Sequence, residues 1–532
     1  MTTSQHDPCP YTALTGVDRR SFLRTALLGA SAAAVAPLAG VWSVEGAEKV
    51  LTIAVPNNPS TFDPINAANH DAMVVSQTIF ENLVEVDPDG VLRPQLASAL
   101  PRISPDRKVY TFDLRDNVQF QDGQKLTAED VKYSFEYVID PKNNALRRPL
   151  FNRISRVVVE SPTRVRVELS EPYRPWLHYL TKYMGIFPKG SREKHGGDYF
   201  KTTPINVGTG PGVFVEWRQN DQVVLKKSPN YWRKGLPAWD RLVVRIVPED
   251  SVRVAYLTTG NVDVISAPPP KDFVRLKTMA GIKGESKPTM GGWFFLMTNT
   301  KKPPFDDVNV RKAISHAIDR PTIAKRVYYD LVDPVAIPAP PRGWWFSKEA
   351  NDLNDFDLEK ARAYLKKSKH PNGFEFEMMI PAQPYLLDVK DAAVVIQSQL
   401  AKLNININTK IIEQGVLLQQ LRLGNHVSAL QVWMSPGEPT YMIDLCYGKD
   451  NVFSRSSGYD NPELVKTITE SYHETDEQAL KPIFARMLKI LAQDSPHIWM
   501  GFVHATNLWR DHVKGFVVNQ GLTMRVKDVD KA

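Results

Sequence analysis

Cysteine is scarce in this sequence: only Cys9 and Cys446 occur among 532 residues. Two cysteines so far apart exclude a disulfide framework, and they are too few for a thiolate zinc site or an iron–sulfur cluster. The eleven histidines show no spacing typical of metal ligands. We therefore expect no metal site and no cofactor.

Familiar catalytic motifs are also missing. The sequence has no G-x-S-x-G elbow, no H-E-x-x-H pair and no Walker A loop. Residues 208–212 look like a nucleotide loop, but Pro211 interrupts them, so we interpret the segment as a tight turn or a crossover between domains. We predict that the protein is not an enzyme. A glycosidase stays open, because the separation of two carboxylates is not readable from a sequence.

No charge of one sign dominates any part of the chain. The 66 Lys and Arg residues exceed the 59 Asp and Glu residues by seven, and they are spread along the sequence. A nucleic-acid binder more often shows a clustered basic stripe. Hydrophobic residues make up 42% and charged residues 23%, as in a globular protein. We expect a monomer of two large domains, or of three or four smaller ones, that binds no nucleic acid.

Long apolar runs are rare, and the one that stands out lies near the N-terminus. It follows the run Arg19-Arg20-Ser21-Phe22-Leu23-Arg24 and extends from residue 25 to about residue 44, rich in Ala and Gly. This pattern resembles a twin-arginine export signal, so it predicts a signal peptide over 1–47 and a periplasmic location. A single membrane anchor is the alternative, since the run is nearly long enough to span a bilayer. Cleavage after Ala36 and cleavage after Gly46 both fit.

The remaining sequence mixes strand and helix patterns. Residues 374–378 alternate as a strand, apolar residues at helical spacing follow over 393–403, and residues 404–408 alternate again. This βαβ unit predicts an α/β protein with a parallel or mixed sheet. Residues 157–159 and 165–169 are predicted to pair as a hairpin.

Several blocks of sequence, taken together, resemble one protein family. The longest is residues 299–313 (NTKKPPFDDVNVRKA), continued by AIDR at 317–320. The others keep the family's order: 96–100 (LASAL), 110–115 (YTFDLR), 120–123 (FQDG), 126–131 (LTAEDV), 207–211 (VGTGP), 230–232 (NYW) and 257–263 (LTTGNVD). The chain is thereby similar to the extracytoplasmic solute-binding proteins of family 5, the dipeptide- and oligopeptide-binding components of bacterial ABC importers.

The resemblance implies a bilobal, periplasmic-binding-protein-like α/β fold of type II, cluster C, with an extra domain inserted in the first lobe. The first lobe would comprise 48–80, 205–290 and 500–532, the extra domain 81–204, and the second lobe 291–499. It also implies capture of a peptide-like or other small polar solute by lobe closure, followed by delivery to a membrane permease. An exported hydrolase on the same scaffold and a solute-sensing receptor partner are the alternatives.

The same resemblance implies where the solute lies. Peptide binders of this family hold the ligand partly as an added β-strand. One edge would be the segment Asn58-Pro59-Ser60, in which Pro59 has no N–H to donate. The other edge would be formed by Trp433, Met434, Ser435, Pro436 and Glu438. Trp293, beside the expected hinge, is predicted to face the cleft, with core packing as the alternative.

One position departs from the family's pattern. Its peptide binders carry an Asp shortly after the tryptophan to pair with the ligand's α-ammonium, and here Ser435-Pro436 stands instead. Losing a buried partner for a cation costs about 3–5 kcal/mol, or two to three decades in affinity. We therefore predict that the protein binds a modified peptide, a sugar, an opine-like compound or another small solute, and not ordinary peptides through a free amino terminus. A one-residue slip that gives the role to Glu438 or Asp444 is the alternative.

Overall fold

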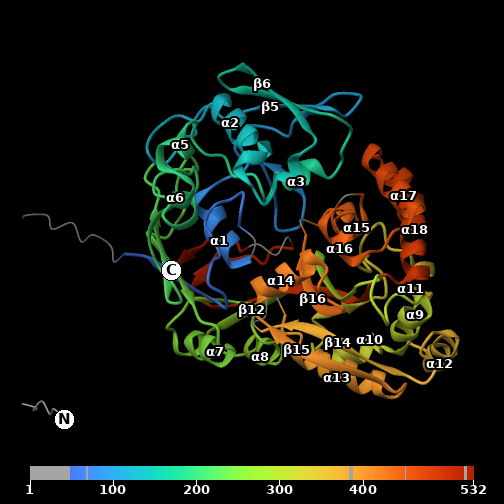
Figure 1. Ribbon diagram of the computed structural model, residues 1–532. Helices are drawn as coiled ribbons and strands as arrows, with labels where there is room; N and C mark the ends of the chain where they lie inside the picture. Colours follow the sequence, from blue (N-terminus) through green and yellow to red (C-terminus); the bar gives the residue numbers. More distant parts are fainter. Residues whose placement is uncertain are drawn as a thin grey trace, which may run out of the picture. The chain divides into compact units, whose positions relative to one another are not determined.

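The computed structural model describes residues 48–67, 70–382, 387–435, 437–449, 451–520 and 524–531 (Figure 1). The predicted signal segment and Pro436 lie outside the described residues. Within those ranges no helix is long and apolar enough to cross a bilayer.

A mixed sheet of eleven strands forms the centre of the described part of the chain. In spatial order its strands are β15 (Ile405–Ile412), β14 (Phe374–Pro381), β16 (Ser428–Met434), β12 (Ile282–Thr298), β17 (Ile498–Arg510), β11 (Val264–Ser266), β1 (Val50–Val55), β10 (Arg241–Ile246), β9 (Gln222–Lys227) and β8 (Gly212–Arg218), and β13 (Val332–Pro334) pairs with β17. Strand β1 is parallel to β10 and β11, and β14 is parallel to β15 and β16. The other neighbours are antiparallel.

The βαβ unit predicted from the sequence is confirmed. Strands β14 and β15 are parallel in the register Phe374 opposite Ile405, and helix α13 (Lys390–Ala401) connects them. The helix buries Ala393, Ile396 and Leu400, which are the positions of its apolar period. Because the two strands are parallel, their carboxyl ends point to the same edge of the sheet.

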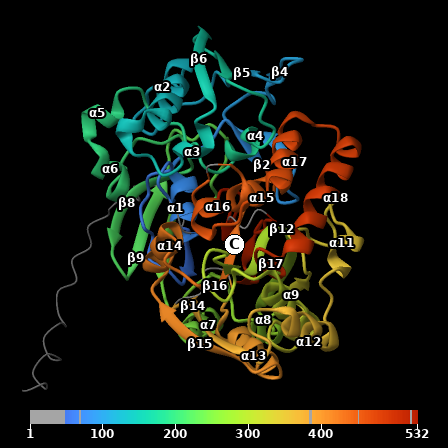
Figure 2. The same cartoon turned by 45° about the vertical axis from the view of Figure 1, so that its right-hand side comes forward.

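The predicted hairpin belongs to a second, smaller sheet. Its strands, in spatial order, are β4 (Arg102–Ile103), β5 (Val109–Asp113), β7 (Arg164–Leu169) and β6 (Ile154–Ser161). Helix α2 (Ala128–Ile139) packs on this sheet and contributes the buried Phe135. Figures 1 and 2 show these elements together at one end of the described chain, apart from the main sheet.

Residues 208–211 form an irregular, close-packed segment that leads into β8, without the hydrogen-bonded tight turn that was one of the two interpretations. A Cβ on Gly208 would lie 1.9 Å from the carbonyl oxygen of Ile79, and one on Gly210 would lie 2.3 Å from that of Thr78. Both glycines are therefore required by the end of helix α1 (His70–Ile79), and the chain enters β8 directly afterwards.

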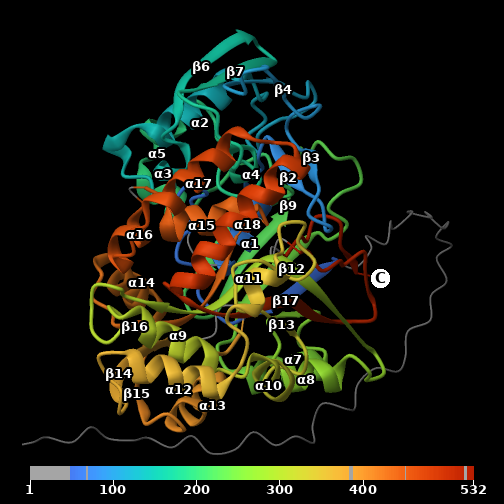
Figure 3. The ribbon, with the colours of Figure 1, turned by 90° about the vertical axis from the view of Figure 1, so that its right-hand side faces the viewer.

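The remaining elements surround the two sheets. Figure 3 shows α17 and α18 side by side with α11 next to them, in agreement with their contacts. The helices are α3 (Arg148–Phe151), α4 (Trp176–Tyr179), α5 (Ser191–His195), α6 (Gly197–Thr202), α7 (Asp250–Thr259), α8 (Pro270–Leu276), α9 (Val308–Ala317), α10 (Arg320–Arg326), α11 (Lys348–Asp352), α12 (Leu358–Lys367), α14 (Gln414–Leu423), α15 (Pro439–Tyr447), α16 (Val452–Ser457), α17 (Pro462–His473) and α18 (Glu477–Asp494), with a 3₁₀ turn at Pro141–Asn143. Two short ribbons pair β2 (Val84–Val86) with β3 (Leu92–Pro94) and β18 (Val513–Lys514) with β19 (Asp530–Lys531).

The pairing between the long strands β12 and β17 is interrupted in the middle. Regular pairs run from Ile282 to Pro288 on β12, the register then shifts, and pairing resumes at Trp293. Ile282, before the break, packs in one hydrophobic cluster, and Leu296, after it, packs in another. A third cluster includes Phe502 and Ala505 of β17, which pair with β12 on either side of the break, so one hydrophobic core continues across it.

Candidate functional site

A cavity of about 650 Å³ lies where several strands of the main sheet end. The loops after β1 and β10 line one side with residues 56–60 and Pro248, and the ends of β15 and β16 line the other with Glu413 and Met434. Strands β1 and β10 run in the opposite direction to β15 and β16, because β16, β12, β17 and β11 are successively antiparallel, so the carboxyl ends of the two groups face each other across the cavity. Ligands of open α/β sheets bind outside the carboxyl ends of strands.

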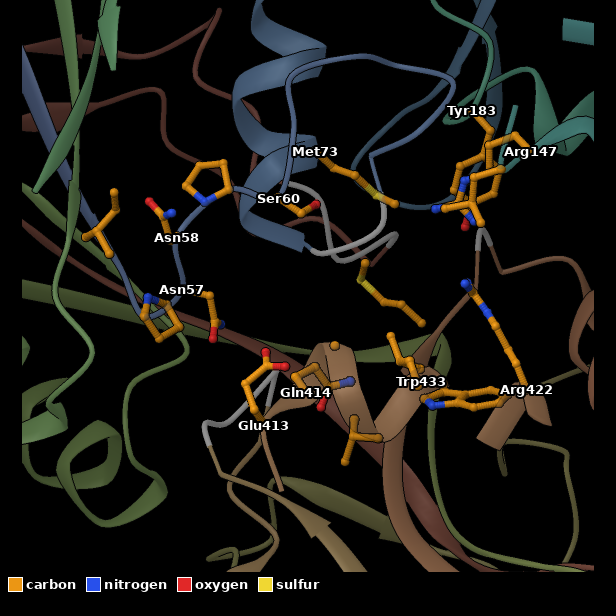
Figure 4. Close-up of a pocket in the computed structure, with 18 of the residues that line it drawn as sticks. Asn57, Asn58, Ser60, Met73, Arg147, Tyr183, Glu413, Gln414, Arg422 and Trp433 are labelled. Carbon is orange, nitrogen blue, oxygen red and sulfur yellow. The ribbon is translucent and has the colours of Figure 1, made fainter. Parts of the chain in front are cut away.

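Five of the predicted site residues line this cavity. Asn58, Pro59 and Ser60 lie on one side, and Trp433 and Met434 lie on the other. Figure 4 shows Asn58 and Ser60 facing Trp433 across the opening. The structure thus places the two edges inferred from the resemblance around one cavity.

Trp217 joins the first edge to β8. Its Nε1 donates to the Oδ1 of Asn58 at 3.3 Å, and its ring packs edge-on against Phe62 with the centroids 4.9 Å apart. These contacts fix the direction of the Asn58 side chain. They also give this side of the cavity an aromatic wall.

Trp293 and Ser435 lie behind the cavity. Trp293 is fully buried, stands opposite Trp433 in the β12–β16 pairing, and packs on Phe502 with a ring separation of 4.9 Å. Its Nε1 donates to the Oγ of the fully buried Ser435 at 3.3 Å. This arrangement corresponds to the core-packing alternative for Trp293.

Glu438 is held by partners of its own. One carboxylate oxygen forms an ion pair with Arg174 Nη2 at 2.5 Å, and the other accepts the backbone N–H of Tyr441 at 2.8 Å as the N-cap of α15. The Glu438 side chain has no exposed surface. Its charge is therefore compensated within the protein, and it does not line the cavity.

Asp444 is similarly engaged. Its carboxylate accepts hydrogen bonds from Tyr173 at 3.1 Å and from Tyr472. Burial raises the pKa of Asp444, although the tyrosine hydroxyls oppose this shift. Like Glu438, Asp444 connects residues 173–174 to the α15–α17 region and does not line the cavity.

Two arginines occupy one end of the cavity. Arg147, just before α3, donates from Nη2 to the carbonyl of Ala67 at 2.6 Å, and its guanidinium lies 4.3 Å from the ring centroid of Tyr183. Arg422, in the last turn of α14, extends toward Arg147 in Figure 4. Within the described part of the chain neither arginine forms an ion pair with an acidic side chain.

The positive charges at this end affect one another. Partial burial and the charge of Arg147 lower the pKa of Arg422. Lys182 is buried nearby, with its Nζ 3.7 Å from the sulfur of Met434, and burial together with the charge of Arg147 lowers its pKa to about 7. This end of the cavity therefore carries the two arginine charges, and Lys182 adds a further positive charge below about pH 7.

Glu413 is the acidic residue among those that line the cavity in the described structure. Its Oε2 accepts the backbone N–H of Val416 at 2.9 Å as the N-cap of α14. Figure 4 shows Glu413 with Gln414 toward the end occupied by Asn57 and Asn58, away from Arg147. The two ends of the cavity thus differ in charge.

Arg147, Arg422 and Glu413 were not predicted from the sequence as residues that line the cavity. Arg147 lies in an irregular loop with no motif, and Arg422 lies on a helix whose only signal is the apolar pair Leu417 and Leu421. Neither position carries a pattern that marks it as cavity-lining. Only the fold brings the two segments together.

Comparison with known proteins identifies the family. The model of the "Bacterial extracellular solute-binding proteins, family 5 Middle" matches residues 91–454, more than half of the chain. The chain belongs to this family. This confirms the resemblance inferred from the sequence blocks.

Relatives of this family 5 protein match over most of its length. The glutathione-binding protein GsiB of Escherichia coli O6:K15:H31 is 25% identical over 494 residues, which cover 91% of this chain and 95% of GsiB. AgaA of A. tumefaciens R10, solved with agropinic acid, is 26% identical with a TM-score of 0.81 and covers 91% of this chain and 99% of its own. DppA of Helicobacter pylori, a periplasmic binding protein solved with the peptide STSA, is 24% identical with a TM-score of 0.81, covering 91% and 98%.

The fold of this family 5 protein is the predicted α/β fold of type II periplasmic binding proteins. The matched members are binding proteins by name. Among the described residues, no group of three or more His, Cys, Asp or Glu side chains is arranged to hold a metal ion.

Proposed function

We propose that this protein captures a small polar solute outside the cytoplasmic membrane and delivers it to the permease of an ABC importer. The observation that carries the proposal is the cavity, whose walls come from the carboxyl ends of two oppositely directed groups of strands in a member of the solute-binding family. Its volume of about 650 Å³ suits a solute the size of a short peptide or an opine.

The proposed mechanism is closure of two lobes around the solute, with the boundaries given by the resemblance: 48–80, 205–290 and 500–532 against 291–499, with 81–204 as the extra domain. The register break between Pro288 and Trp293 supports a hinge there. Gly291 lies in this stretch, and a Cβ on it would lie 2.4 Å from the Oγ of Ser435. Small-angle scattering with and without a bound solute tests the closure, because the radius of gyration should fall on binding.

We further propose that Asn58, Pro59, Ser60, Trp433 and Met434 contact the solute. In this proposal Trp293, Ser435 and Glu438 support the wall behind them, since each is buried against protein partners. A free α-ammonium would find neither Glu438 nor Asp444 available. We therefore propose that a free amino terminus is not required for binding.

A thermal-shift screen followed by calorimetry tests this function. The panel contains dipeptides and tripeptides, each free and N-acetylated, with glutathione, opines and sugars. A solute at 100 times its Kd should raise the free energy of unfolding by about 2.7 kcal/mol. We expect the free and N-acetylated forms of a peptide to bind equally. Sub-micromolar binding of free peptides that N-acetylation abolishes would overturn the amino-terminus proposal. In that case, the affinity of Glu413→Gln for the free peptide would show whether Glu413 binds the α-ammonium. Formation of a product during the screen would favour an enzyme.

Export to the periplasm is proposed from residues 1–47. The expected signal depends on the arginine pair, so Arg19→Lys with Arg20→Lys should leave the protein in the cytoplasm, as cell fractionation would show. Export of the double variant at the wild-type level would contradict a twin-arginine signal.

A further inference from the structure

The charge distribution in the cavity points to a class of solute. We propose that the solute is acidic and that its anionic group lies between Arg147 and Arg422. The other end of the solute would carry hydroxyl or amide groups. This proposal rests on the proposed solute capture. The following observations support this assignment.

Contacts within the protein use only part of the Arg147 guanidinium. Nη2 is used by the carbonyl of Ala67, and the ring of Tyr183 covers one face of the guanidinium. Its Nε is buried and has no hydrogen-bond partner among the described residues. Nη1 forms no hydrogen bond within the described residues, so this nitrogen can donate to an incoming anionic oxygen.

Arg422 approaches from the opposite wall. It belongs to α14, which follows the β15 side of the sheet, whereas Arg147 precedes α3 in the region of the smaller sheet (Figure 4). Two guanidinium groups that face each other without an intervening acid repel. A carboxylate or phosphate between them would replace this repulsion with two charge-assisted contacts, and the planar guanidinium matches both groups.

The far end of the cavity has a different chemistry. Asn57, Asn58 and Gln414 present amide groups there, and Glu413 adds a negative charge. A second anionic group at this end would meet the charge of Glu413, whereas a hydroxyl or an amide N–H would donate to it. Between the ends, Met73 and Trp433 supply apolar surface.

The test uses pairs of compounds that differ only in the acid group: N-acetyl-Ala-Ala and its C-terminal amide, gluconate and gluconamide, and glutathione and its diester. Calorimetry at low ionic strength measures each affinity for the wild type, Arg147→Gln, Arg422→Gln and the double variant. Arg275→Gln is the matched control, because it removes the same charge at an exposed position on α8.

The acid of each binding pair should bind at least about tenfold more tightly than its neutral analogue. Each cavity variant should lose about ten- to hundredfold in affinity for the acid and little for the neutral analogue. In the double variant the preference for the acid should be the smallest, whereas Arg275→Gln should behave as the wild type. Arg147→Lys keeps the positive charge but not the planar guanidinium, so it should retain part of the preference for the acid. This result would show that Arg147→Gln loses affinity through the missing charge and not through a folding defect. Arg422 has no ion pair within the described residues, so its variant tests the assignment even if Arg147→Gln unfolds.

Neutral analogues that bind as tightly as the acids, or an acid preference in Arg422→Gln equal to that of the wild type, would overturn the anion assignment while leaving solute capture intact. If no compound of the panel binds at millimolar concentration, the assignment and the proposed capture are both contradicted. If the wild type and the double variant bind the acids with equal Kd values, the two arginines do not hold the acid group.

Discussion

Two charged groups of residues near the cavity differ in how their charges are compensated. The acids Glu438 and Asp444 are buried, and each has partners within the protein: Arg174 for the first, Tyr173 and Tyr472 for the second. The cations Arg147 and Arg422 line the cavity without an acidic partner in the described structure. The two acids are therefore engaged in contacts within the fold, whereas the two cations have no acidic partner among the described residues.

A charged side chain that lies near the cavity is therefore not a ligand-binding residue on that ground alone. Both acids follow the tryptophan near which the family's peptide binders carry their ammonium anchor. Their hydrogen bonds, however, connect residues 173–174 to α15 and α17. A charge acts on the solute only where the protein has not already neutralised it.

Removing Glu438 should have the largest effect on stability. Glu438→Ala leaves the half-buried Arg174 without its acidic partner, which should lower the free energy of unfolding by up to about 3 kcal/mol. Urea unfolding measures the change. Arg174→Ala should have a comparable cost, and the double variant should lose less than the sum of the two, because the pair interacts directly. The folded fraction of Glu438→Ala should bind solute normally, and loss of binding at unchanged stability would make Glu438 a ligand group.

Acidification should strengthen binding of an acidic solute through Lys182. The pKa of Lys182 is about 7, lowered by burial and by the charge of Arg147, and Tyr183 and Met434 are among its neighbours. Lys182 is protonated below this pKa, so affinity should fall up to about tenfold as pH rises from 6 to 8. Calorimetry at both pH values measures the effect.

Lys182→Met should remove this pH dependence. Its affinity at pH 6 should resemble that of the wild type at pH 8. An unchanged pH profile in the variant would assign the titration to another group.

Asp444 offers a smaller test of the acid cluster. Burial raises its pKa above the usual 3.8, so the folded state holds a proton more tightly than the unfolded state does. The resulting stabilisation is complete below pH 3.8 and is lost as pH rises through the folded-state pKa. Each tenfold difference in proton affinity between the two states contributes about 1.4 kcal/mol. Relative to the wild type, Asp444→Asn should therefore become more stable as pH rises from 4 to 7.

Urea unfolding across this range measures the difference, with Asp198→Asn at an exposed position as the control. A difference between wild type and Asp444→Asn that stays constant with pH would show that burial does not favour the protonated form.

The sequence predicted the parts of this molecule that depend on local periodicity. The alternation at 374–378 and 404–408 and the helical spacing at 393–403 are properties of neighbouring residues, so the βαβ unit was readable. The orientation of the Glu438 side chain was not readable from the sequence. Its role as the N-cap depends on where α15 begins, and its ion pair depends on Arg174 from a distant segment. The meeting of Arg147 and Arg422 is a property of the fold alone.

The smallest expected effect is on the stability of Arg422→Gln. Because Arg422 has no acidic partner in the described structure and faces the charge of Arg147, its removal should change the free energy of unfolding by less than about 0.5 kcal/mol. Any change should be a gain, and it should be larger at low salt, where repulsion between the two guanidinium groups is less screened. Urea unfolding at low and high salt measures it. A loss above about 1 kcal/mol would mean that Arg422, like Glu438, holds the fold together, and the contrast between the two charged groups would then fail.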